Sequence, residues 1–125
     1  MEYRLLGRTG VQVSSLCMGT MSFGGDADEA ASAAMFARCR DAGINFFDTA
    51  NVYSNGRSEE ILGKLVAGCR DEIVLTSKVG FSAGSDRNAR GHSRRHIALA
   101  VEASLRRLGT DRIDLYFLHT FDPIP

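Results

Sequence analysis

Features that would place a protein in a membrane, on nucleic acid or in an oxidising compartment are missing from this sequence. No apolar run approaches the ~18–20 residues that a membrane-spanning helix needs. The 15 basic and 15 acidic residues give a net charge of zero, which argues against a nucleic-acid or anionic-membrane partner. Cys17, Cys39 and Cys69 are odd in number and lack C-x-x-C spacing, so we expect buried free thiols rather than disulfides.

The start of the chain also lacks the layout of a secretory signal. Residues 1–4 do not form a basic region leading into an apolar stretch, so we expect a cytoplasmic protein. The 125 residues are 44% hydrophobic and 24% charged, which is typical of a globular fold. We therefore expect one domain over residues 1–125.

Strand and helix signals alternate along the chain. A small hairpin comes first, because short extended pieces at residues 3–6 and 11–13 flank a turn bounded by Gly7 and Gly10. Apolar strands and amphipathic helices then follow in turn. The expected strands are residues 15–19, 44–47, 73–76 and 113–118; the expected helices run from residues 26–28 to Gly43, from Ser58 to Gly68 and from Ser93 to Gly109.

Helical periodicity predicts the buried faces of the helices. In the first helix the expected core stripe is Ala31, Ala34, Met35, Cys39 and Ala42. In the third helix it is Ile97, Val101, Ser104, Leu105 and Leu108. A polar, glycine-rich loop over residues 80–91 precedes that third helix.

Repeated strand–helix units predict a parallel sheet with right-handed crossovers. The expected strands are almost entirely apolar, as parallel strands covered by helices should be. Four such strands fit either an open doubly wound sheet or a (β/α)₈ barrel. The alternation alone does not choose between the two architectures.

Polar side chains stand where these strands end. Asp48 follows one strand, Lys78 another and His119 a third, and Tyr53 comes five residues after Asp48. Because the carboxyl ends of parallel strands share one rim, we expect these four side chains to converge where barrel and doubly wound enzymes place their active sites.

These four groups suit proton transfer to a carbonyl oxygen. A phenol is a poor proton donor at neutral pH, but a nearby ammonium improves it by stabilising the phenolate. Lys78 could supply that ammonium, Asp48 could keep Lys78 charged, and His119 could hydrogen-bond the carbonyl oxygen. No side chain supplies a hydride, so a nicotinamide cofactor is implied.

Several blocks of the sequence also resemble the aldo-keto reductases, nearly from end to end. The most specific block is GINFFDTA at residues 43–50 together with Tyr53. The others are LGRTG (6–10), MGTMSFG (18–24), RSEE (57–60), TSK (76–78), SLRRLG (104–109) and IDLY (113–116). The family resemblance implies a parallel (β/α)₈ barrel of the TIM type, and the absence of a G-x-G-x-x-G pattern agrees with a barrel rather than a Rossmann reductase.

The resemblance implies roles for particular residues. The catalytic tetrad carries over to Asp48, Tyr53, Lys78 and His119, with Tyr53 as the proton donor and His119 orienting the substrate carbonyl. The implied cofactor is NADPH, and the residues expected to approach it are Gly19, Thr20, Met21 and Asp48. The substrate is expected to be a small aldehyde or ketone, contacted by Tyr53, His119 and Phe23, with Met21 and Phe81 lining what remains of the pocket.

A barrel of this type takes about 250 residues, so four strands in 125 residues make its first half. In the family, most of the cofactor site comes from the second half. Four strands alone would expose two sheet edges and an apolar inner face, so we expect a homodimer or higher oligomer. The rival explanation is a truncation product of a longer enzyme.

Other functions stay open beside NADPH-dependent carbonyl reduction. One is a non-catalytic half-barrel that self-associates and carries a vestigial tetrad. Another is the role of the family's regulatory members, which bind cofactor and a partner such as a channel, although no residue pattern favours it.

Simpler explanations also exist for individual residues. Asp48 and Lys78 could form an ordinary ion pair at a sheet edge. His92 and His96 have the i, i+4 spacing of a metal pair, but no third ligand is evident, and a solvated helix start is the better interpretation. The arginines of the glycine-rich loop and the next helix start could reach a phosphate, although a polar loop explains them as well; they are Arg87, Arg90, Arg94 and Arg95.

Overall fold

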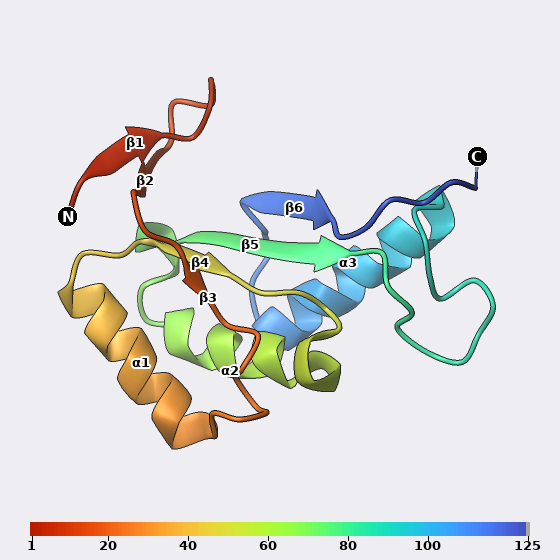
Figure 1. The fold of residues 1–125 in the computed structure, drawn as a ribbon, viewed down its shortest axis with the longest axis horizontal. Coiled ribbons are helices and arrows are strands. Elements are labelled where there is room, and N and C mark those ends of the chain that lie inside the picture. The colour runs from red at the N-terminus through yellow and green to blue at the C-terminus, as the bar shows by residue number, and fades with distance from the viewer. Residues whose placement is uncertain (125) are drawn as a thin grey trace.

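The computed structural model describes residues 1–124 and contains one four-stranded parallel sheet (Figure 1). β3 (Met18–Gly19), β4 (Phe46–Asp48), β5 (Val74–Val79) and β6 (Leu115–Leu118) lie side by side in that order. Each crossover therefore moves the chain on by one strand in the same direction. That progression is the one a (β/α)₈ barrel uses, whereas a doubly wound sheet reverses its strand order partway.

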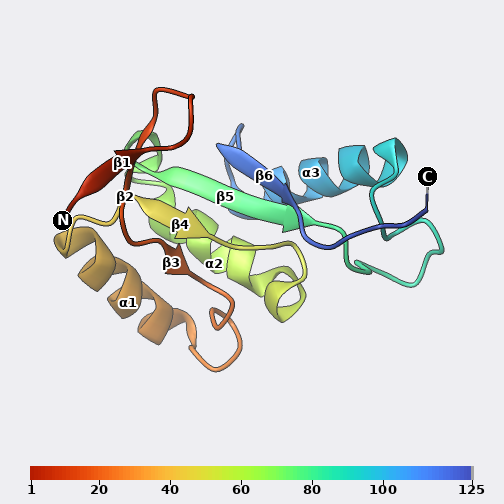
Figure 2. The ribbon, with the colours of Figure 1, turned by 45° about the horizontal axis from the view of Figure 1, so that its top comes forward.

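Three helices cover one face of this sheet (Figures 1 and 2): α1 (Glu29–Asp41), α2 (Arg57–Val66) and α3 (Arg94–Leu108). The hydrophobic core lies between the helices and the sheet. Its fully buried side chains include Phe23, Phe47, Ile61, Leu62, Leu75 and Leu108. None of the helices within residues 1–124 is long and apolar enough to cross a membrane.

The opposite face of the sheet has no helix over it in the described part of the chain. Its side chains surround an open cavity of ≈ 340 Å³; they belong to Cys17, Gly19, Phe46, Asp48, Thr76, Lys78 and Phe117. Phe117 is 41% exposed there. In a closed barrel this face would point toward the axis, where side chains fill the interior.

The predicted hairpin is present at the amino-terminal end of the sheet. β1 (Tyr3–Leu5) and β2 (Gln12–Ser14) pair antiparallel, with Tyr3 opposite Ser14. The Tyr3 hydroxyl donates to the carbonyl oxygen of Gly43 at 2.7 Å, and the Ser14 backbone N–H donates to Asn45 Oδ1 at 2.8 Å. Because Gly43 and Asn45 directly precede β4, these bonds fasten the hairpin across the end of the sheet where the strands begin.

The helix ends mostly follow the sequence signals. Asp28 caps α1 by accepting from the Ala31 N–H, Ser93 caps α3 by accepting from the His96 N–H, and Gly109 ends α3 in the left-handed conformation. α2 differs, because it begins at Arg57 rather than at a Ser58 cap. The Ser58 hydroxyl is instead turned inward, toward Thr20 and Thr49.

The predicted core face of α1 was partly right: Met35 and Cys39 pack against the core, but the three predicted alanines do not. Ser32 and Phe36 are the buried residues of this helix, whereas Ala31, Ala34 and Ala42 are exposed. Small alanines contribute little to burial, so the large Phe36 ring sets how the helix is turned. Its centroid lies 4.8 Å from that of Phe47 on β4.

The cysteines are all free, as predicted, but they are not all buried. Cys39 and Cys69 are half-buried beside the core, whereas Cys17 is an exposed residue beside the open cavity. The sequence pattern did not distinguish the covered face of the sheet from the open one. Partial loss of solvation and the nearby Asp48 carboxylate raise the pKa of the Cys17 thiol to about 11, so the thiol is protonated at neutral pH.

Gly63 allows α2 and α3 to pack in direct contact. A methyl group at Gly63 would lie 2.4 Å from the carbonyl oxygen of Leu108, and a backbone atom cannot move away without separating the helices. We expect Gly63→Ala to lower the free energy of unfolding by about 1–3 kcal/mol in urea denaturation.

Gly68→Ala is the matched control, because an added methyl there meets no atom within 4 Å. This variant should be neutral or slightly stabilising, by up to about 1 kcal/mol. Equal losses in the two variants would contradict close packing at Gly63.

Candidate active site

The carboxyl-terminal rim of the sheet brings the four predicted residues together. Asp48 is the last residue of β4 and Lys78 the second-last of β5, while His119 directly follows β6. Tyr53 begins the short 3₁₀ turn η1 (Tyr53–Gly56), which leads from β4 into α2. The parallel register pairs Asp48 with Thr76 and Lys78 with Phe117, so these ends lie at one level of the sheet.

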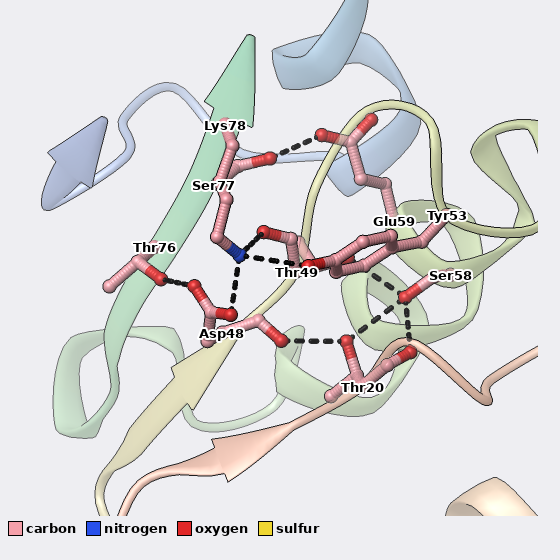
Figure 3. A network of polar contacts seen from close by, with 9 residues as sticks. All are labelled: Thr20, Asp48, Thr49, Tyr53, Ser58, Glu59, Thr76, Ser77 and Lys78. Carbon is pink, nitrogen blue, oxygen red and sulfur yellow. Dashed lines mark hydrogen bonds and ion pairs between the residues drawn. The ribbon is translucent and has the colours of Figure 1, made fainter. Parts of the chain in front are cut away.

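The Lys78 ammonium is the centre of this group (Figure 3). Lys78 Nζ lies 2.5 Å from Asp48 Oδ2, 2.8 Å from the carbonyl oxygen of Thr49 and 3.3 Å from the Tyr53 hydroxyl. The Thr76 hydroxyl donates to the other Asp48 oxygen. Three acceptors thus surround the three N–H bonds of one ammonium, which fixes its position.

This ion pair is largely withdrawn from solvent, since the exposed fractions are 14% for the Lys78 side chain and 23% for that of Asp48. Withdrawing two charges from water is unfavourable unless they pair well and keep further hydrogen bonds. The extra bonds from Thr76 and to Thr49 meet that condition. An ion pair on the surface would not need these two additional hydrogen bonds. The arrangement therefore suits a lysine whose ammonium has to stay beside Tyr53.

A left-handed turn directly after Tyr53 sets the direction of its ring. Ser54 and Asn55 have φ values of 49° and 53°, and Gly56 has 91°. Non-glycine residues rarely adopt this conformation, so its occurrence twice in succession marks a locally constrained loop. Lys78 Nζ lies 5.0 Å from the centroid of the Tyr53 ring, near enough for a favourable cation–π contact.

His119 also packs against the Tyr53 phenol. Its ring meets the Tyr53 ring edge-on at a centroid distance of 5.7 Å and the Phe81 ring at 4.8 Å. Burial, and secondarily the Lys78 charge, lower the pKa of the His119 imidazole, which is therefore neutral at pH 7. Its Nδ1 is buried without a hydrogen-bond partner, which favours the tautomer with the proton on Nε2, because a bare nitrogen is less costly there than an unpaired N–H.

Two histidines, the buried His96 and the half-buried His119, predict that the stability of the chain decreases as the pH is lowered. Burial lowers the pKa of His119, and burial and the neighbouring His92 lower that of His96, so the unfolded chain binds these protons more readily. Stability is therefore complete above the ordinary value of 6.5 and declines as the pH drops through it. We expect the urea midpoint to decrease between about pH 7.5 and 5.5.

His119→Gln should show a smaller decrease over the same range, because one of the two titrating groups is gone. The carboxylates whose pKa values are shifted do not interfere, because hydrogen bonds lower the pKa of Asp122 from 3.8 and that of Glu29 from 4.5. Equal or greater stability at pH 5.5 than at pH 7.5 would show that the imidazoles are not held neutral.

A chain of buried hydroxyl groups supports the rim from below (Figure 3). The Ser58 hydroxyl donates to the carbonyl oxygen of Thr20 at 2.7 Å and lies 2.8 Å from the Thr49 hydroxyl. The Thr20 hydroxyl in turn donates to the carbonyl oxygen of Asp48 at 2.9 Å. These bonds join the ends of β3 and β4 to the first turn of α2, so they fix the segment between Asp48 and Tyr53.

The residues predicted to approach a cofactor or substrate occupy different environments. Gly19 is exposed beside Asp48 and Lys78, and Met21 is 67% exposed above it. Thr20 and Phe23 are fully buried, Thr20 among the hydroxyl groups and Phe23 in the hydrophobic core. Their side chains are therefore not available to NADPH or a substrate in this structure. Thr20 comes directly after Gly19 and faces the other side of the sheet, whereas Phe23 lies in the turns after β3 and packs into the core.

The rim fits the nicotinamide end of a cofactor. A carbon added at Gly19 would meet no atom within 4 Å, so the space in front of this residue is open. The adjoining cavity carries Asp48 and Lys78 on its wall. A planar ring lying against Gly19 would thus be beside the ion pair.

His92 and His96 have the spacing of a metal pair but no third ligand beside them within residues 1–124. No group of three or more His, Cys, Asp or Glu side chains within residues 1–124 is placed to hold a metal ion. His96 is buried, 4% exposed, so the expected solvated helix start was wrong. Ala100, one turn along α3, is buried on the same face and shows that this face of the helix packs inward.

A second, larger cavity of ≈ 800 Å³ adjoins the rim between the glycine-rich loop and the segment after His119. Phe81, Arg87, Arg90, His92 and Phe121 are among its lining residues. Arg94 and Arg95 are exposed on the first turn of α3. Phosphate binding by these arginines stays a prediction.

Glu59 is a site residue that the sequence analysis missed. In the sequence, Ser58, Glu59 and Glu60 together have the pattern of an acidic helix start, which explains Glu59 without any role in a site. In the structure its carboxylate is fully buried and accepts from Ser77 Oγ and Arg107 Nε, each at 2.6 Å. The signal that could have found it is its place in an apolar helical stripe with Leu62 and Val66, because a carboxylate in such a stripe needs a partner.

A family model described as "Aldo/keto reductase family" matches residues 15–124 of the chain. The chain is 41% identical over 126 residues to a protein of Oryza sativa subsp. japonica named probable voltage-gated potassium channel subunit beta. It is 45% identical over 134 residues to the uncharacterized oxidoreductase YrpG of Bacillus subtilis. Each match covers 98% of this chain but only 38% and 41% of the respective relative.

A solved structure, the holo form of the aldo-keto reductase AKR11C1 from Bacillus halodurans, superposes with a TM-score of 0.83 at 41% identity. The match covers 94% of this chain and 40% of that one. The predicted fold class is confirmed: the chain has the fold of part of a parallel α/β barrel. It spans about two fifths of the length of the relatives it matches.

Proposed function

This chain belongs to the aldo/keto reductase family, and we propose from that premise that it carries the proton-transfer part of an NADPH-dependent carbonyl reductase. Membership of this family supports oxidoreductase activity in general. The finer proposal is that an aldehyde or ketone is reduced reversibly to an alcohol. The observation that supports it most is the Lys78 ammonium, which joins Asp48 and the Tyr53 hydroxyl in one hydrogen-bonded group.

In this proposal Tyr53 is the proton donor. Its hydroxyl gives a proton to the carbonyl oxygen, and the Lys78 ammonium, 3.3 Å away, stabilises the phenolate that remains. Asp48 holds Lys78 charged and in place. His119 hydrogen-bonds the carbonyl oxygen through Nε2 and so orients the substrate over the phenol.

NADPH would supply the hydride that reduces the carbonyl carbon when it is bound. The residues of this chain that would contact its nicotinamide end are Gly19, Met21 and Asp48, with Lys78 beside them. The substrate would contact Tyr53 and His119, and Phe81 could form part of the pocket wall because its ring packs against His119.

NADPH binding to the purified chain tests this proposal. Nicotinamide fluorescence should change saturably as NADPH is added, with a dissociation constant in the micromolar to millimolar range, because only part of a cofactor site is present. Asp48→Asn should weaken the binding. No saturable change for the wild-type chain would support the alternative of a non-catalytic half-barrel with a vestigial tetrad.

We also propose that a second copy of the chain covers the open side of the sheet. Phe117 and Leu118 of β6 and Phe121 after it are 41%, 57% and 85% exposed, and an unpaired strand edge with apolar side chains favours association. Analytical ultracentrifugation should give a dimeric or larger mass at micromolar concentration. A monomeric mass there would exclude self-association as the means of covering this face.

A partner-binding role is the second candidate function, favoured by the name of the rice relative, probable voltage-gated potassium channel subunit beta. The two functions differ in one outcome. A partner-binding protein without reductase activity would bind NADPH but would not consume it when an aldehyde is added. A cytoplasmic location fits either role and stays a prediction.

A further inference from the structure

Glu59 is a fully buried carboxylate outside the four residues that meet at the rim. It lies in the first turn of α2, with 0% of its side chain exposed. Ser77 Oγ donates to Glu59 Oε1 at 2.6 Å, and Arg107 Nε donates to Glu59 Oε2 at 2.6 Å (Ser77 and Glu59 are drawn in Figure 3). Both oxygens are thus partnered, as a buried carboxylate requires.

The two ends of the Ser77–Glu59 hydrogen bond belong to the elements that carry Lys78 and Tyr53. Ser77 is the neighbour of Lys78 on β5, and successive side chains of a strand point to opposite faces. Ser77 therefore faces the helices while Lys78 faces the rim. Glu59 follows Tyr53 by six residues, through the left-handed turn η1 and the start of α2.

We propose that Glu59 is a positioning residue for proton transfer, holding β5 against α2 so that Lys78 Nζ stays within hydrogen-bond reach of the Tyr53 hydroxyl. The role in proton transfer rests on the proposed carbonyl reduction. That Glu59 holds β5 against α2 rests only on its hydrogen bonds to Ser77 and Arg107. The Lys78–Tyr53 distance of 3.3 Å is the longest of the three Lys78 contacts and so the one most sensitive to a shift of β5 relative to α2.

The rival role for Glu59 is purely structural, an ion pair that joins α2 to α3 through Arg107. A substitution of Ser77 distinguishes the positioning role from the structural one. Ser77→Ala removes the link to β5 and leaves the Arg107 pair intact. Glu59→Gln keeps the link, because its amide can donate to the Ser77 hydroxyl while its carbonyl accepts from Arg107.

Glu60→Gln is the matched control for the charge change. Glu60 is the next residue of the same helix turn, but its exposed carboxylate pairs with Arg57 at 2.6 Å and makes no hydrogen bond or ion pair to β5 or α3 within residues 1–124. An effect of lost negative charge at the start of α2 would appear in both glutamine variants.

The readout is the exchange of the lysine ammonium protons with water, followed by ¹⁵N NMR of labelled side chains. The chain has only two lysines, Lys64 and Lys78. Lys64 is 63% exposed in its pair with Glu29, so it serves as an internal reference. Lys78 has three acceptors and should exchange much more slowly than Lys64 in the wild-type chain.

We expect Ser77→Ala to speed the exchange of Lys78 by at least about tenfold, with Lys64 unchanged, because the rim opens locally more often. Glu59→Gln and Glu60→Gln should stay within about threefold of the wild type. Backbone amides of α1 and β4 should keep their protection in Ser77→Ala, which a general loss of stability would not allow.

Three results would overturn the proposal. The first is a Lys78 exchange rate in Ser77→Ala equal to that of the wild type, and the second is an acceleration in Ser77→Ala that all protected backbone amides share. The third is a Lys78 that exchanges as fast as Lys64 in the wild-type chain. If Ser77→Ala does not fold, Glu59→Met/Arg107→Met replaces it. That variant also removes the partner of Ser77 and leaves no unpaired charge, so it should speed Lys78 exchange equally. The NMR experiment contains no NADPH or substrate, so it can fail while reduction is observed, or succeed while the chain proves inactive.

Discussion

Tyr53→Phe is expected to lower the rate of NADPH-dependent aldehyde reduction by about 10²–10⁴-fold, the usual contribution of a general acid. The reason is that the phenylalanine ring keeps the packing against His119 but has no proton to give. NADPH affinity should be nearly unchanged, because the Tyr53 hydroxyl faces Lys78 rather than the open surface at Gly19. The measurement is NADPH oxidation at 340 nm with 4-nitrobenzaldehyde.

Tyr116→Phe is the control for this substitution. The Tyr116 phenol lies near Glu59 and Arg107, away from the rim, so its loss should leave the rate within about threefold of the wild type. An unaltered turnover number in Tyr53→Phe would remove Tyr53 as the proton donor, whatever the family resemblance.

Arg107→Met should cause the largest loss of stability of any single change considered. It leaves the Glu59 carboxylate fully buried with only the Ser77 hydroxyl as a partner. Breaking a buried ion pair from one side typically costs about 3–5 kcal/mol, and the 28% exposure of Arg107 places this site toward the lower end. Urea denaturation followed by circular dichroism measures the loss.

The double variant Glu59→Met/Arg107→Met should recover most of this stability, because it leaves no unpaired charge in the core. The cycle of two single variants and the double variant isolates the pair. If Arg107→Met costs no more than a surface substitution, about 0.5 kcal/mol, the Glu59 carboxylate is not held as described.

The sequence was sufficient to predict the parts of the site that follow from strand direction. Asp48, Lys78 and His119 each stand at the carboxyl end of an apolar strand, and parallel strands bring such ends to one rim. Tyr53 joined them because five residues from Asp48 permit only a short turn. The choice of a barrel over a doubly wound sheet required the observed order β3, β4, β5, β6.

The sequence did not predict which polar residues support the rim from the helix side. Ser58 and Glu59 match a helix start, since short polar and acidic residues are favoured there for local reasons. Most of their partners come from other elements of the chain, and only tertiary packing brings them together: Ser58 bonds to Thr20, and Glu59 bonds to Ser77 and Arg107. The same limit explains Thr20 and Phe23, whose places beside a cofactor-approaching glycine suggested contact but whose side chains face inward.

The orientation of α1 was predicted only in part, for a different reason. Five small or medium apolar residues follow a regular helical period, but burial depends on the area that each side chain can contribute. Phe36 contributes more than the alanines, so the helix turns toward Phe47 and leaves Ala31 and Ala34 in solvent. A weighting by side-chain size would have placed the core stripe correctly.

In the proposed function, the rim of this chain holds one carbonyl group where a bound nicotinamide would supply a hydride and Tyr53 a proton. The most direct test of this function is reduction of 4-nitrobenzaldehyde by the purified chain with NADPH deuterated at C4 of the nicotinamide ring, on the face whose hydrogen is transferred. Mass spectrometry of the alcohol should show one deuterium on the carbinol carbon, and Tyr53→Phe should form almost none of that product. Alcohol without deuterium, or equal labelled product from Tyr53→Phe, would contradict the account.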